Sequence, residues 1–188
     1  NYYKSKHDIS SNRLTAYLQR QFEDKTSYGT YFFNLGVRGQ YWDFNKEFFP
    51  SPRVSVSLKP NIKQDILLRF ATGIYAQFPF YREYRDNEGN LNYDIKSQKS
   101  LHFVLSSDWN FVMMERKFKF TTAAYYKYLW DLIPYEIDNV RIRYTAQNNA
   151  KGYATGLDMK LFGEFIKGID SWVTLSFLQT KQNIDGDG

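Results

Sequence analysis

Apolar and polar residues alternate along residues 53–80, and this pattern predicts a pair of β-strands. Successive side chains of a strand point to opposite faces, so a period of two separates one face from the other. The second half of the pattern continues for about 13 residues, whereas soluble strands are usually shorter and a tilted strand needs ~9–11 residues to cross a bilayer. The apolar positions are Val54, Val56 and Leu58, followed after a turn at 60–64 by Leu68, Phe70, Ile74, Ala76 and Phe78.

The same alternation recurs in six further segments, so we predict about eight strands. Short connections follow the first, third, fifth and seventh strands, and longer ones follow the others. Membrane barrels keep this rhythm because their periplasmic turns are short and their external loops are long. The sequence therefore predicts an all-β fold, an antiparallel meander of about eight long strands that forms part of a transmembrane β-barrel. The further strands are expected at residues 10–24, 31–42, 101–111, 117–131, 142–161 and 173–177, with connections at 25–30, 43–52, 79–100, 112–116, 134–139 and 163–170.

The apolar positions change phase within residues 142–161. Ile142 and Tyr144 have even numbers, whereas Leu157 and Met159 have odd numbers. One extra residue in a continuous strand moves every later side chain to the opposite face, so we predict a β-bulge at 148–152. A separate short hairpin before the strand is the alternative interpretation.

The composition is compatible with such a barrel and also with a soluble β-sandwich that has one wet face. Aromatic residues make up 19% of the chain. The mean hydropathy is nevertheless −0.59, and no apolar run approaches the ~20 residues of a membrane helix. Without cysteine the chain forms neither disulfides nor thiolate metal sites. The 25 Lys and Arg residues are scattered singly, a distribution that argues against nucleic-acid binding.

Several short motifs, in their order and spacing, resemble the barrel of TonB-dependent outer-membrane receptors, the energised importers of Gram-negative bacteria. Together they cover nearly the whole chain. Residues 14–19 (LTAYLQ) resemble the family's "sAYlQ" strand, 35–38 (LGVR) its "lGvRyd" strand, 52–54 (PRV) its "PRl" start and 73–79 (GIYAQFP) its "GyyyQ.P" strand end. Residues 124–133 and 152–158 resemble the pattern "ayYk…dli…a.GvE".

The resemblance implies that residues 1–188 are a partial outer-membrane β-barrel domain, a middle-to-late segment of the wall of a nutrient importer. Family members have about twenty-two strands, an N-terminal plug domain and a short segment that contacts TonB. The aromatic-rich composition favours the Bacteroidetes type. The implied ligand is a siderophore, a cofactor, an oligosaccharide or a peptide. The implied partners are outer-membrane lipid and lipopolysaccharide, the plug domain of the same receptor, TonB and a small-molecule or oligomer ligand, with a surface lipoprotein as a further candidate.

No catalytic constellation emerges, because His7 and His102 are far apart and neither lies in a recognised motif. We therefore expect no enzyme activity, no metal and no cofactor. Ligand contacts are expected at the external end of the inner face, where Arg and Tyr offer rigid donors and stacking surface. The candidates are Arg38, Gln40, Trp42, Tyr75, Gln77, Tyr81, Arg82, Tyr84, Arg85, Tyr125 and Asp131. The alternative is that these side chains pack against the plug domain or against one another.

Two other functions remain open from the sequence. Eight strands can close alone around packed side chains, which would give a self-contained outer-membrane barrel with an anchoring or adhesin role. A soluble β-sheet domain that binds a ligand is the third hypothesis. Aromatic residues near the strand ends favour the membrane, because such side chains form girdles at the headgroup level. The girdle candidates on the apolar face are Tyr41, Trp109, Tyr126, Tyr128 and Trp130.

Overall fold

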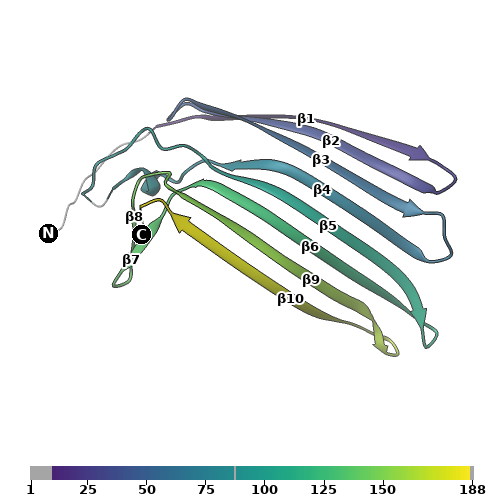
Figure 1. The fold of residues 1–188 in the computed structure, drawn as a ribbon. Coiled ribbons are helices and arrows are strands. Elements are labelled where there is room, and N and C mark those ends of the chain that lie inside the picture. The colour runs from purple at the N-terminus through teal and green to yellow at the C-terminus, as the bar shows by residue number, and fades with distance from the viewer. Residues whose placement is uncertain (1–9, 87, 187–188) are drawn as a thin grey trace.

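The fold is a single antiparallel meander of long strands (Figure 1). The computed structural model describes residues 10–86 and 88–186. The eight-stranded sheet has the order β1-β2-β3-β4-β5-β6-β9-β10, and a two-stranded hairpin, β7-β8, stands apart from it. The strands are β1 Arg13–Lys25, β2 Gly29–Trp42, β3 Glu47–Pro60, β4 Asp65–Gln77, β5 Gln98–Met113, β6 Arg116–Leu132, β7 Tyr135–Asp138, β8 Arg141–Tyr144, β9 Ala150–Ile166 and β10 Ile169–Ile184, with a 3₁₀ helix, η1, at Tyr81–Tyr84. The predicted all-β meander is thus confirmed.

The connections divide the sheet into two unlike ends. Tight turns join β1 to β2, β3 to β4, β5 to β6 and β9 to β10, and they gather at one end, called here the turn end (Figure 1). The other end, the loop end, holds the segment 78–97 with η1 and the segment 133–149 with the β7-β8 hairpin. Strand lengths of 13 to 17 residues separate the two ends. Each strand of the sheet is therefore long enough to cross a bilayer when tilted.

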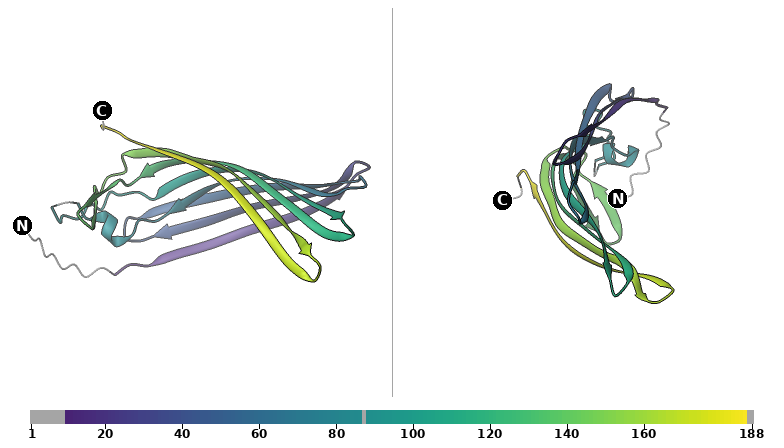
Figure 2. Two further views of the ribbon diagram at one scale, coloured as in Figure 1. Left: turned by 90° about the horizontal axis from the view of Figure 1, so that it is seen from below. Right: turned by 90° about the vertical axis from the view of Figure 1, so that its right-hand side faces the viewer.

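The sheet is bent into a trough, and its two faces differ in chemistry. Figure 2 shows the strands curving around the side on which η1 lies. Cross-strand partners share a face, so the register Gly36↔Arg53↔Gly73↔His102↔Lys127 defines the concave face. The adjacent row of cross-strand partners, displaced by one residue on every strand, defines the convex face. Its side chains are Leu35, Val54, Thr72, Phe103 and Tyr126. The concave face is polar and the convex face is apolar, as the period of two predicts.

The apolar convex face has no second layer over it in the described part of the chain. Leu18 is 75% exposed, Val173 63% and Leu105 60%. The accessible surface is 13583 Å², whereas a folded monomer of this mass is expected to have about 9,400 Å². The excess is what an open, one-layer sheet produces. A soluble sheet of this size would bury its apolar face against another layer.

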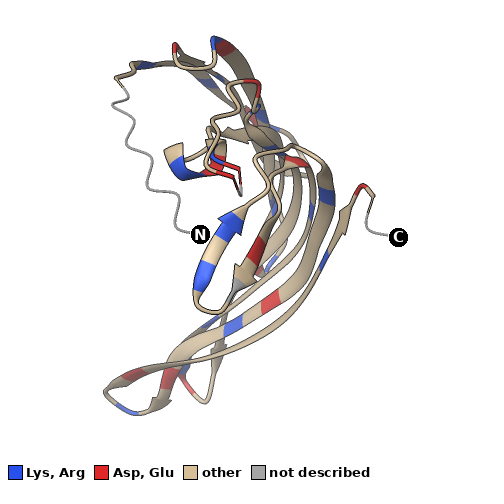
Figure 3. Cartoon of the chain, turned by 90° about the vertical axis from the view of Figure 1, so that its left-hand side faces the viewer, with Lys and Arg blue, Asp and Glu red and all other residues tan. Residues whose placement is uncertain are grey.

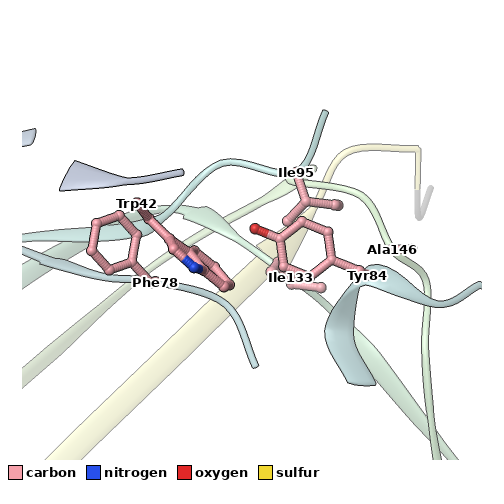
Figure 4. Packing of buried hydrophobic residues seen from close by; sticks show 6 residues of the cluster. All are labelled: Trp42, Phe78, Tyr84, Ile95, Ile133 and Ala146. Atoms are coloured by element: carbon pink, nitrogen blue, oxygen red, sulfur yellow. The ribbon is translucent and has the colours of Figure 1, made fainter. Parts of the chain in front are cut away.

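Apart from Phe118 near the turn end of β6, the buried apolar residues of the described chain lie at the loop end. Trp42, Phe78, Tyr84, Ile95, Ile133 and Ala146 form one buried group, called here the loop-end cluster (Figure 4). Trp42 is on the concave face of β2, and the other members come from the segments 78–97 and 133–149. The two long connections therefore fold inward over the mouth of the trough and pack on one another there.

The predicted β-bulge at 148–152 is wrong, and the alternative hairpin is confirmed. Residues 141–144 belong to β8, which pairs with β7 outside the main sheet. Strand β9 begins at Ala150 and pairs with β10 in constant register from Ala150 to Gly163. The two phases of the apolar pattern differ because they belong to two separate ladders, so no inserted residue is needed.

The predicted loop at 43–52 is also wrong in its second half, because β3 begins at Glu47. Pro50 and Pro52 lack the backbone N–H and argue against a central strand. They are accommodated because β3 and β4 pair only through residues 53–58 and 68–73. Residues 47–52 have β2 as their strand neighbour on one side only, so this section behaves like an edge strand.

Smaller differences concern the last third of the chain. The expected loop at 134–139 contains β7. The expected strand at 173–177 extends over Ile169–Ile184, and the turn before it shrinks to residues 167 and 168. Strand β10 is polar on both faces over residues 179–183, so its apolar alternation ends before its backbone pairing with β9 does.

Candidate functional site

The structure brings most of the predicted ligand residues to the loop-end half of the trough. Arg38, Gln40, Trp42, Tyr75, Gln77 and Tyr125 lie on the concave face by their cross-strand register. Tyr81, Arg82 and Tyr84 form part of η1, which covers that face at the loop end, and Arg85 follows it. Asp131 lies where the β6-β9 register shifts, with a positive φ of 54°. Their role in ligand binding stays a prediction.

Trp42 is the centre of an aromatic group at the loop end (Figure 4). Its ring lies 5.3 Å from the Phe44 ring, 5.3 Å from Phe78 and 5.7 Å from Tyr84, measured between centroids. The Arg13 guanidinium lies 4.0 Å from the Trp42 ring centroid, a distance at which a cation is attracted to the ring face. These contacts bind η1 and its loop to the first two strands.

Trp42 and Tyr84 are fully buried, so in this conformation they support the mouth of the trough rather than face its interior. Tyr81 is 44% exposed, and its hydroxyl shares a 2.7 Å hydrogen bond with Ser11 Oγ. Ser11 Oγ also accepts a 2.9 Å hydrogen bond from Trp42 Nε1. Of the aromatic candidates in η1, Tyr81 is therefore the one available to a solute.

Burial perturbs two titratable groups of η1. Burial raises the pKa of the Tyr84 phenol, and the nearby Glu47 carboxylate adds to the effect. The Tyr84 hydroxyl has no hydrogen-bond partner among the described residues. Burial also raises the pKa of the Glu83 carboxyl, although its Oε2 accepts a 2.8 Å hydrogen bond from Phe80 N. Both groups are thus held in a poorly hydrated place beneath the loop.

A buried ion group fastens the loop end to the wall. Lys99 Nζ lies 2.6 Å from Asp131 Oδ2 and 3.7 Å from Glu47 Oε1, and its side chain is only 12% exposed. Glu47 Oε2 also accepts hydrogen bonds from the backbone N and the Oγ of Ser97, at 2.8 and 2.6 Å. This arrangement joins β3, β5 and β6, so Asp131 has a structural partner that the sequence does not indicate.

A stack of side chains crosses the middle of the concave face. The Arg53 guanidinium lies 4.5 Å from the Tyr75 ring centroid, and the Tyr75 ring stacks on His102 at 4.4 Å. Arg53 is absent from the predicted site residues because the prediction concentrated on the ends of strands. Arg53 directly precedes the apolar Val54 in β3, and this alternation is the sequence signal that places Arg53 on the polar face.

A second charged group lies nearer the turn end, and sequence reasoning also missed it. Asp108 is 6% exposed, pairs with Arg69 and lies 3.2 Å from Lys119 Nζ. Thr121 Oγ1 donates a 3.0 Å hydrogen bond to the same carboxylate. Three strands thus meet through one buried acid, as the register β4-β5-β6 allows. Figure 3 shows that other charged residues are dispersed along the strands.

The described residues contain no group of three or more side chains suited to hold a metal ion. His102 stacks on Tyr75, and His7 lies outside the described residues. Within the described parts of the chain, no helix has the length and apolar character needed to span a membrane.

Comparison with known proteins finds no family model, no curated protein and no solved structure that matches this chain. Evidence for function therefore comes from the geometry of the two faces and from the sequence motifs.

Proposed function

We propose that this chain is a section of the wall of a transmembrane β-barrel in the outer membrane. The observation that carries the proposal is the uncovered apolar face on the outside of a curved sheet whose inside is polar. Lipid would cover the convex face, since strands of a membrane barrel alternate apolar-out and polar-in. In water each large apolar side chain left exposed forgoes about 1.5–3 kcal/mol of burial free energy.

The aromatic residues of the convex face support the same orientation. Tyr41, Tyr126 and Tyr128 are about two-fifths exposed, at 39%, 42% and 40%, in the loop-end halves of β2 and β6. Trp109, 42% exposed, lies in the turn-end half of β5. Tyr and Trp at both limits of an apolar band match the girdles that flank the hydrocarbon region in membrane barrels.

The outer strands favour a wall that continues beyond the strands described here. Strand β1 pairs only with β2, and β10 only with β9, among the described residues. Unpaired backbone groups along a lipid-facing edge cost several kcal/mol each, so a membrane sheet has to close. Figure 2 shows β1 and β10 at opposite margins of the trough. Further strands would therefore stand between them in the complete barrel.

With the motif resemblance, the specific form of the proposal is a segment of a TonB-dependent receptor that imports a scarce nutrient. In this role the segment is scaffold and part of the binding vestibule, and it performs no catalysis. The loop-end cluster would shape the external mouth, and the concave face would look into the lumen towards the plug domain of the same receptor. Energy coupling would come from TonB through parts of the receptor other than this wall.

The test places lysine on one face or the other of the full-length protein. Phe33, Phe70 and Phe120 point to the convex face, and their sequence neighbours Asn34, Ala71 and Thr121 point to the concave face. Because a Lys on the lipid face near the midplane costs ~2–4 kcal/mol, we expect the triple variant Phe33→Lys, Phe70→Lys, Phe120→Lys to lose membrane insertion. The matched variant Asn34→Lys, Ala71→Lys, Thr121→Lys should still insert.

Insertion is measured by resistance of the membrane fraction to alkaline extraction and by heat-dependent mobility in detergent gels. Equal insertion of both variants, or a wild-type protein that stays soluble without detergent, would contradict the proposal. Loss of insertion in the concave-face variant alone would mean that the two faces have been assigned the wrong way round.

A further inference from the structure

Two adjoining hollows open on the concave face between β1 and β4. Their volumes are about 260 and 460 Å³. Both are lined by Gln19, Gly36 and Arg53. Gly36 forms their common floor, and a Cβ built there would have no atom nearer than 3.5 Å. The absence of a side chain at Gly36 therefore leaves open space at mid-height in the trough.

Two arginines from neighbouring strands border this space. Arg53 is the cross-strand partner of Gly36, and Arg38 is the partner of Ser51, so the two arginines are diagonal neighbours on one face at about 7–8 Å. The Tyr75 ring lies 4.5 Å beneath the Arg53 guanidinium. Stacking on a ring fixes the plane of a guanidinium and leaves its N–H edges free to donate.

Arg38 is half-buried, and its Nε has no hydrogen-bond partner among the described residues. The Oγ of Ser51, which is 1% exposed, likewise has none there. Buried donors without partners are rare in folded proteins, because each costs about 1–3 kcal/mol. The side chains of Arg38 on β2 and Ser51 on β3, which are cross-strand partners, thus carry a donor and a hydroxyl without hydrogen-bond partners among the described residues.

No carboxylate neutralises these cations within the described part of the trough. Three adjacent rows of cross-strand partners on the concave face contain or adjoin the two arginines. No side chain in these three rows, from β1 to β10, is Asp or Glu. Lys127 adds a third cation to the row of Arg53. Three acids on this face in more distant rows pair with other cations, Glu47 with Lys99, Glu23 with Lys25 and Asp108 with Arg69.

We propose that the hollow between Arg38 and Arg53 binds the oxyanion of a small solute, either a carboxylate or a phosphate group. Both groups are planar or tetrahedral acceptors that match the two parallel N–H bonds of a guanidinium. The inference rests on the proposed function, because it requires that the concave face be a water-filled lumen. It adds to that function a chemical class of ligand and a position, mid-height in the wall rather than at its rim.

The experiment titrates the full-length protein in detergent with citrate and, separately, with inorganic phosphate, using calorimetry at low ionic strength. We expect saturable binding of at least one anion, weakened tenfold or more by Arg38→Gln and by Arg53→Gln. Gly36→Val fills the floor without changing charge and should weaken binding to a similar degree. Arg20→Gln removes the same charge from the convex face and should leave binding unchanged. Tighter citrate binding would indicate a carboxylate ligand, and tighter phosphate binding a phosphate ligand.

Three results would overturn the inference. The first is the absence of saturable binding of either anion, which is also expected if an acidic stretch of the same protein fills the hollow. The second is binding that survives both arginine substitutions. The third is an equal loss in the Arg20→Gln control, which would reveal only a general charge effect. Wild-type protein that inserts but does not bind refutes this inference alone, whereas protein that fails to insert refutes the proposed function as well.

Discussion

The convex wall and the loop-end cluster follow opposite rules although the same chain builds both. On the wall, leucine, valine and phenylalanine point outward and remain exposed, as Leu18 does at 75%. In the loop-end cluster, Trp42 and Tyr84 are completely enclosed by other side chains. The cluster encloses its apolar side chains as a protein core in water does, whereas the wall leaves them exposed. Under the proposed function, the boundary between the two marks where water gives way to lipid.

The largest expected effect on this contrast comes from Trp42→Ala. Removing a buried tryptophan costs about 3–5 kcal/mol in a packed core. We expect this loss to appear locally, as faster hydrogen exchange of residues 78–97 by a hundredfold or more, while the strands keep their protection. Trp172→Ala is the matched control, because Trp172 is 64% exposed at the turn end. Unchanged exchange in Trp42→Ala would show that the cluster does not hold the loop.

An intermediate effect is expected from Lys99→Met, which leaves Glu47 and Asp131 without their cation. A buried donor or acceptor left without its partner costs about 1–3 kcal/mol, and a charged one costs more. Limited proteolysis should therefore cut the segments 78–97 and 133–149 faster in this variant. Lys25→Met is the control, since its ion pair with Glu23 is exposed, with side-chain exposures of 76% and 48%, and should contribute under about 0.5 kcal/mol.

The smallest effect at neutral pH, and a distinctive one in alkali, is expected from Tyr84→Phe. The pKa of Tyr84 is raised above its ordinary value of 10.0, so its contribution to stability is complete below that pH and is lost as the pH rises above it. Its hydroxyl has no partner in the described part of the chain, so removing it should cost little at pH 7. We expect Tyr84→Phe to keep the segment 78–97 protected from proteolysis at pH 11, where wild type begins to open. Tyr81→Phe, at a position 44% exposed, should behave like wild type there.

Much of the sheet could be predicted from sequence because apolar positions on the convex face alternate with polar positions on the concave face. Val54, Val56 and Leu58 suffice to place the faces of β3, and the register with β4 agrees. Prediction failed where the alternation had another cause. Ile142 and Tyr144 alternate within a separate hairpin, and Pro50 and Pro52 disguise a strand that has a partner on one side.

The candidate site was less predictable, because its contacts are far apart in sequence. The alternation places Trp42 and Arg38 on the polar face, but it does not reveal that η1 buries Trp42 or that Arg38 faces a hollow. Arg53 acquires interest only through Tyr75 and Gly36, which lie on other strands. Gly36 illustrates the limit well, since a missing side chain leaves no sequence signal until its neighbours are known.

The short β3-β4 ladder has a mechanical consequence. Residues 53–58 and 68–73 alone join these strands, whereas β2 and β3 are joined along the whole of residues 29–42 and 47–60. Shearing the trough between its two halves therefore breaks fewest backbone hydrogen bonds at this seam. Among the described ladders, this one is therefore expected to separate first when the trough widens, and the pair Arg53 and Gly73 stands at its loop-end limit.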